Sequence, residues 1–199
     1  MKAVTGDEFE KYLVPTRLLK MSWLSTRGDM GRAFLYDDPI FGVFSVNLLF
    51  EKFRGNIAAH FEKVYKEIKA FLPEVSKENK TLFTYALTLA DLLRLKSGFR
   101  KELYLAHKAG SKDRLRKLLK VVPLLKKKYE AMCKAQRKIW LLERKPEGLE
   151  ALDVRYGSQL KRLDVAAERI KDYLSGKIKR ISELEETPRN IYSRTPYRN

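Results

Sequence analysis

The side chains that could bind a metal or support catalysis are few in this 199-residue sequence, and their spacing matches no recognised site. His60 and His107 are expected on different helices, and Cys133 is the single cysteine. A structural zinc site needs about four such ligands at characteristic spacing. Nor is there a glycine-rich loop that would cradle a phosphate. The sequence therefore predicts no metal site and no cofactor.

Nucleophilic and acid–base catalysis have no better support in the sequence. Cys133 lies on or near the packed side of a helical pattern, where a cysteine usually behaves as a small apolar residue. Asp37 and Asp38 are adjacent, but a glycosidase holds two carboxylates about 5 to 10 Å apart across a sugar. A role in a turn or cap suits this pair better. We predict no catalytic residue, and no hydrolytic activity from this chain alone.

The net charge of +17 raises the possibility of a polyanionic partner. Between residues 111 and 145 the sequence has 13 basic and 3 acidic residues. However, lysine and glutamate are abundant while asparagine and glutamine are scarce, a composition typical of proteins from heat-loving organisms. A solvated basic face is therefore the favoured interpretation. Nucleic-acid binding stays open as an alternative, although no known DNA- or RNA-binding motif is present.

The sequence predicts four long helices, which would position these residues. From Val46 onward, apolar residues recur every three or four positions, which is the spacing of an amphipathic helix. The breaks in this pattern are Pro73, Gly110, residues 145–148 and Gly176. Pro123 either kinks the third helix or divides it into two. Because short connections favour antiparallel neighbours, we predict an all-α fold: an antiparallel bundle of four to five long helices with an irregular N-terminal segment.

The sequence divides into three regions. Residues 1–45 form an irregular segment or linker with a short helix near residues 15–24. Residues 46–186 form the helical bundle, whose second helix begins near Ser76 and is the most buried. Residues 187–199 are a basic tail that includes tyrosines.

No apolar run reaches the roughly 20 residues that span a bilayer, and the first residues lack the apolar core of a signal peptide. A single cysteine excludes an internal disulfide framework. We therefore expect no membrane association and a cytoplasmic location.

Residues 140–178 carry the most distinctive motif of the chain. It reads Trp-x-x-Glu-x-Lys-Pro-x-Gly-x-Glu-x-x-Asp-x-Arg-x-Gly, then Arg-Leu, then Asp-Tyr-Leu-x-Gly-Lys-Ile. This motif resembles the C-terminal helical domain of bacterial β-N-acetylhexosaminidases of glycoside hydrolase family 20. Residues 35–42 are similar to the linker that enters that domain, and residues 109–112 to its inter-helix turn. The resemblance covers residues 34–186.

The resemblance implies a non-catalytic accessory domain that packs against and supports a glycosidase barrel, in the same chain or in another. Catalysis in such enzymes depends on an Asp-Glu pair of a barrel that has about 250 residues. Residues 1–33 cannot contain that barrel, so the family's catalytic residues map onto no position here. Glu147 and Leu149 also replace two aromatic residues that are usual in the family.

The corner between the third and fourth helices is the expected contact surface. The candidate interdomain contacts are Trp140, Lys145, Glu150, Asp153, Arg155 and Tyr156. The charged members would pair with barrel residues or, equally, within the domain, and Asp153 would brace the fourth helix. The partner would be the barrel or a second copy of this chain. A protein adaptor is a further alternative.

Overall fold

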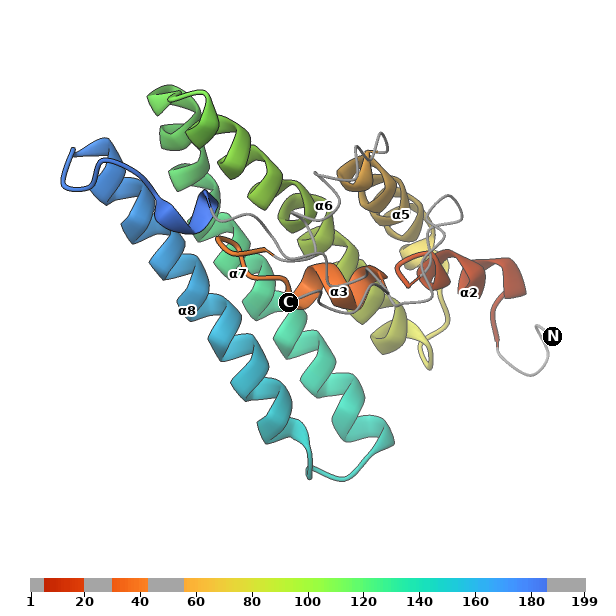
Figure 1. The fold of residues 1–199 in the computed structure, drawn as a ribbon. Helices are drawn as coiled ribbons and strands as arrows, with labels where there is room; N and C mark the ends of the chain where they lie inside the picture. Colours follow the sequence, from red (N-terminus) through yellow and green to blue (C-terminus); the bar gives the residue numbers. More distant parts are fainter. Residues whose placement is uncertain (1–5, 20–29, 43–55, 186–199) are drawn as a thin grey trace, which may run out of the picture.

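The computed structural model describes residues 6–19, 30–42 and 56–185, and within these ranges it contains helices and no strand (Figure 1). The α-helices are α2 (Phe9–Thr16), α3 (Met30–Tyr36), α5 (Ile57–Phe71), α6 (Lys80–Lys108), α7 (Lys112–Glu143) and α8 (Leu149–Leu174). Two short 3₁₀ turns are η1 (Leu72–Glu74) and η2 (Ser182–Leu184). The predicted all-α bundle is confirmed.

Helix α6 is the centre of the core, as predicted, and contacts α5, α7 and α3. Phe83, Ala90 and Leu93 are fully buried along one side of it. The neighbouring Leu82 is exposed. The apolar stripe steps through Phe83, Ala86 and Ala90, and Leu82 lies about 100° away from Phe83 around the helix.

The start of α6 is set by a residue far away in the sequence. The buried carboxylate of Asp7 accepts hydrogen bonds from Ser76 N (3.0 Å), Ser76 Oγ (2.7 Å) and Asn79 Nδ2 (2.8 Å). These hydrogen bonds, chiefly the one from the Ser76 hydroxyl, lower the pKa of Asp7. They hold residues 76–79 as a turn, so α6 begins at Lys80 and not near Ser76.

Residues before 43 contribute directly to the core. The short helix α2 ends at Thr16 and has Pro15 in its last turn, and residues 20–24 of the helix expected near residues 15–24 lie outside the described residues. Phe34 and Leu35 of α3, with Ile40 after it, are buried in the same cluster as the long helices. The proposed domain boundaries near residues 45 and 186, and the tail of residues 187–199, lie outside the described residues.

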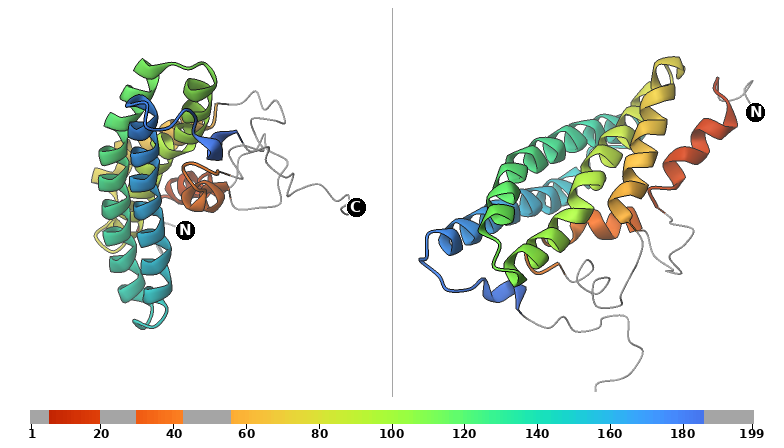
Figure 2. Two further views of the ribbon diagram at one scale, coloured as in Figure 1. Left: turned by 60° about the vertical axis from the view of Figure 1, so that its left-hand side comes forward. Right: turned by 90° about the horizontal axis from the view of Figure 1, so that it is seen from above.

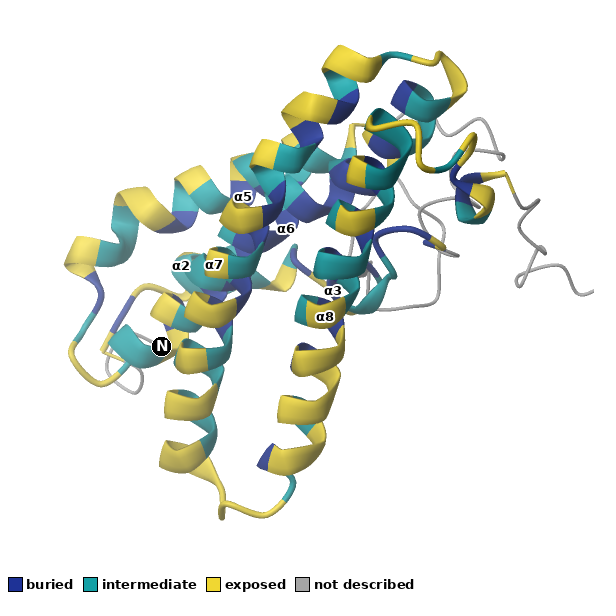
Figure 3. Cartoon of the chain, turned by 90° about the vertical axis from the view of Figure 1, so that its left-hand side faces the viewer, coloured by how far each residue is buried: buried dark blue, intermediate teal, exposed yellow. Residues whose placement is uncertain are grey.

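Helix α7 runs through Pro123 without a break, so this proline does not divide it into two helices. Helix α8 packs against α7, and this pair extends as a two-helix hairpin beyond the ends of α5 and α6 (Figures 1 and 3). After α8 the chain returns to the core through Ile181 and Leu184, which are buried. Figure 2 shows α3 and η2 on the same side of the long helices.

Candidate functional site

The two histidines are used for structure. His60 Nε2 lies 2.9 Å from the carbonyl oxygen of Arg17, and His107 Nε2 accepts a hydrogen bond from Ile181 N at 3.1 Å. Because His107 accepts through this nitrogen, it is neutral, and burial lowers its pKa. Among the residues that the structure describes, no group of three or more His, Cys, Asp or Glu side chains could hold a metal ion.

Cys133 is half-buried on α7. Burial raises the pKa of its thiol to about 11. The thiolate is the nucleophilic form of cysteine, so this side chain is protonated and unreactive near neutral pH. The geometry agrees with the interpretation of Cys133 as a small apolar residue.

Asp37 and Asp38 follow α3, and Asp38 has the turn role that the sequence predicted. Asp38 Oδ1 accepts hydrogen bonds from Ile40 N (2.7 Å) and Phe41 N (3.0 Å), and its carboxylate pairs with Arg162 of α8. These donors and the Arg162 charge lower the pKa of Asp38 against the opposing effect of burial. Its carboxylate therefore fixes the segment after α3 onto α8.

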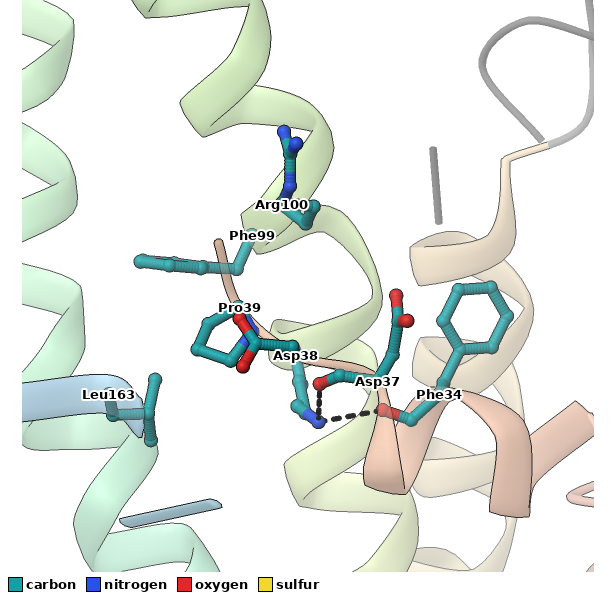
Figure 4. A pocket seen from close by; sticks show the side chains of 8 residues that line it. Phe34, Asp37, Asp38, Pro39, Phe99, Arg100 and Leu163 are labelled. Carbon is teal, nitrogen blue, oxygen red and sulfur yellow. Dashed lines mark hydrogen bonds between the residues drawn. The ribbon is translucent and has the colours of Figure 1, made fainter. Parts of the chain in front are cut away.

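Lys96 of α6 is a buried cation that joins the same segment to the core. Its Nζ donates to the carbonyl oxygens of Phe34 (2.9 Å), Leu35 (2.7 Å) and Asp37 (2.7 Å), and to Gln159 Oε1 of α8 (2.8 Å). The bonds to Phe34 and Asp37 are drawn in Figure 4. Carbonyls at a helix C-terminus lack intrahelical partners, and Lys96 supplies the donors that the end of α3 needs.

Arg100 lies one turn further along α6 and is 3% exposed. Its Nε and Nη1 have no hydrogen-bond acceptor among the described residues, and burial lowers its pKa to about 10. The guanidinium points away from the Asp38 carboxylate (Figure 4). The cavity beside these residues has a volume of only about 10 Å³, the size of one water molecule, and cannot hold a substrate.

The predicted contact residues divide into two groups in the structure. Trp140, Lys145, Glu150 and Asp153 lie around the turn between α7 and α8. Trp140 Nε1 donates to the Lys145 carbonyl oxygen at 2.8 Å, and its ring lies against Gly148. Trp140 therefore closes the corner from within the domain.

The acidic residues of this corner have partners within the domain. Glu150 Oε2 accepts a hydrogen bond from Gly148 N at 2.9 Å, so it caps the start of α8. Asp153 pairs with Arg137 of α7 at 2.5 Å and so braces α8, as predicted. Lys145 is exposed. For Asp153 the intradomain ion pair is therefore observed, whereas Glu150 is held by a backbone hydrogen bond.

Arg155 and Tyr156 lie elsewhere, at a pocket between α3, α6, α7 and α8. Tyr156 is buried, its ring stacks on that of Tyr36 with centroids 6.0 Å apart, and its hydroxyl donates to Gln136 Oε1. Burial raises the pKa of Tyr156. The exposed Arg155 guanidinium lies 5.8 Å from the centroid of the Tyr36 ring. Sequence reasoning did not find this pocket, because its walls come from four separate elements.

A known family matches most of the chain. The family model of the Glycoside Hydrolase 20C C-terminal domain matches residues 25–198. The chain belongs to this family. No curated protein matches it significantly. The suspected relationship to the C-terminal domain of family 20 hydrolases is therefore confirmed.

The two positions that the resemblance marked as departures from the family differ in exposure. In this glycoside hydrolase 20C C-terminal domain, Leu149 is buried at the start of α8, whereas Glu147 is exposed. Position 149 therefore packs within the domain, and of these two positions only 147 faces outward.

None of the helices in the described ranges has the length and apolar character that a membrane span needs.

Proposed function

We propose that this chain is a non-catalytic accessory domain that packs against the catalytic barrel of a β-N-acetylhexosaminidase and supports it. The barrel would be part of the same chain or of another. The family match supports this role, because it relates the chain to the C-terminal domain of a glycoside hydrolase. A cytoplasmic location remains a prediction, and a second copy of the chain is the alternative partner.

The projecting α7–α8 hairpin is the observation that carries the proposal. Its tip exposes three large apolar side chains: Leu141 (49% exposed), Leu142 (67%) and Val154 (72%). Its corner is rigid, because Trp140 is hydrogen-bonded and packs against Gly148. Contiguous apolar patches commonly mark a contact with another protein, and both helices of the tip contribute exposed apolar side chains. A fixed tip of this kind is suited to docking against a neighbouring domain.

The basic charge of α7 gives less support to nucleic-acid binding than the sequence suggested. Lys126 pairs with Asp164 at 2.7 Å, Lys128 pairs with Asp91, and Arg137 pairs with Asp153. Each pair places a carboxylate beside a cation that would otherwise neutralise a phosphate. The protein-docking interpretation is therefore favoured.

A binding experiment with tip variants tests the proposed role. The family 20 barrel from the same genome would be titrated with the wild-type chain and with the double variant Leu142→Asp/Val154→Asp. We expect about tenfold or greater weakening, because charge replaces apolar contact area. Leu124→Asp is a matched control, since Leu124 is a 45% exposed leucine in the middle of α7. Equal affinity of all three proteins would contradict docking through the hairpin tip.

A further inference from the structure

The proposed role leaves unexplained a pocket beside Tyr36. Its volume is about 220 Å³. It is lined by Leu19, Gly31, Arg32, Leu35, Tyr36, Tyr85, Leu89, Gln136, Leu152, Arg155 and Tyr156. Pockets for drug-sized ligands usually have about 300 to 1,000 Å³. This smaller pocket suits a single side chain inserted from a partner.

The composition of the pocket is that of a protein contact. Tyrosine and arginine are enriched where a few residues dominate the binding energy, and such residues often pair with a well-packed pocket. Here three tyrosines and two arginines line one small space. The stack of Arg155, Tyr36 and Tyr156 is held by the buried Tyr156 hydroxyl, which donates to Gln136. The pocket walls are therefore ordered before a partner arrives.

The charge of the pocket selects an acidic side chain. Among the described residues that line it none is acidic, and the exposed Arg155 lies at its edge. Within the described part of the chain, Arg155 has no carboxylate at ion-pair distance, in contrast to Arg137 and Arg162, which are paired with Asp153 and Asp38. An arginine beside aromatic rings with no acidic partner is complementary to a carboxylate, which it can bind through two parallel hydrogen bonds.

We propose that this pocket receives a glutamate or aspartate side chain of the catalytic barrel, with Arg155 as its ion-pair partner. This inference rests on the proposed function, since it names the polar anchor of the same docking event. The hairpin tip would supply the apolar contact, and the pocket would fix the orientation of the two domains. Charged pairs across an interface contribute to its specificity and register.

Charge reversal at one position tests the anchor. Arg155→Glu should weaken binding of the family 20 barrel about tenfold or more, and Arg155→Lys should weaken this binding much less. Lys161→Glu is the matched control, because Lys161 is exposed on the same helix and the charge change is identical. We expect Lys161→Glu to bind within about twofold of the wild type. Circular dichroism would check that each variant is folded.

A zero-length cross-link identifies the occupant. In the Arg155→Lys variant, a carbodiimide joins the new amine to a carboxylate that touches it, and mass spectrometry of the digested complex locates the bond. We expect a cross-link from position 155 to an acidic residue of the barrel. A cross-link to a second copy of this chain would overturn the inference, as would a normal complex with no cross-link and no effect of Arg155→Glu. If the wild-type chain does not bind the barrel at all, both the proposed function and this inference are wrong.

Discussion

Lys96 connects three helices through one ammonium group. It reaches the carbonyls at the end of α3 and the amide of Gln159 on α8 from a buried position on α6. Lys96→Met keeps the length of the side chain but leaves these acceptors without a donor. We expect the free energy of unfolding to fall by about 2 to 4 kcal/mol at pH 8, measured by urea denaturation. A loss below about 0.5 kcal/mol would mean that α3 is held by its apolar contacts alone.

Lys96 also makes the free energy of unfolding depend on pH. Burial lowers the pKa of Lys96 to about 7, whereas an unfolded lysine has a pKa of about 10.4. Between these values the unfolded chain binds more protons, so the stability contributed by Lys96 rises with pH, by up to about 1.4 kcal/mol per pH unit. Below about pH 7 both states are protonated and this contribution is constant.

Urea denaturation of the wild type and Lys96→Met from pH 6 to pH 9 checks this linkage, because other titrating groups cancel in the difference. We expect the gap in unfolding free energy to widen above pH 7. A gap that stays constant would show that the four acceptors keep the ammonium charged across this range.

The roles of some residues could be predicted from the sequence and those of others could not. The apolar role of Cys133 and the turn role of Asp38 could be, since a helical pattern and a turn motif are local signals. Lys96 and Asp7 could not, because their partners lie about 60 to 70 residues away and are positioned only by the packing of α3 and α6. Nothing near Lys96 in the sequence distinguishes it from the many exposed lysines of this basic chain.

The corner between α7 and α8 allows a paired test at the scale of the helices. Gly148 has a positive φ of 93°, and a Cβ there would lie 3.1 Å from Trp140 Cζ2. Gly157 lies within α8, where a Cβ would meet nothing within 4 Å. We expect Gly148→Ala to destabilise the domain by about 1 to 2 kcal/mol and Gly157→Ala to stabilise it by about 0.5 to 1 kcal/mol.

Thermal unfolding followed by circular dichroism would measure both glycine variants. The opposite signs are the informative result, since the two substitutions are chemically identical. If Gly148→Ala were neutral, the corner would be looser than the packing of Trp140 implies, and the rigid docking tip would lose its support.

Most helices were predictable, because their apolar residues recur with helical spacing and because prolines and glycines mark their ends. The differences have nonlocal causes. The start of α6 is delayed by the Asp7 hydrogen bonds. The contribution of α3 to the core was missed, because seven residues are too few to show a period.

At the scale of the whole molecule, the excess of positive charge is expected to have no specific nucleic-acid role. Duplex DNA binding should be undetectable at about 150 mM salt, since pairs such as Lys126–Asp164 neutralise part of α7. Fluorescence anisotropy across a salt series measures this. Binding that persists at 150 mM, with a log–log slope near −5, would favour the nucleic-acid alternative.

The central claim is that this helical domain supports chemistry carried out on another domain. The most direct measurement is the half-life of β-N-acetylhexosaminidase activity of the family 20 barrel at elevated temperature, with and without an equimolar amount of this chain. We expect the chain to show no hydrolysis of an aryl N-acetylglucosaminide alone and to lengthen the half-life severalfold, since a ligand that binds only the folded barrel stabilises it. Equal half-lives with and without the chain, or hydrolysis by the chain itself, would contradict the account.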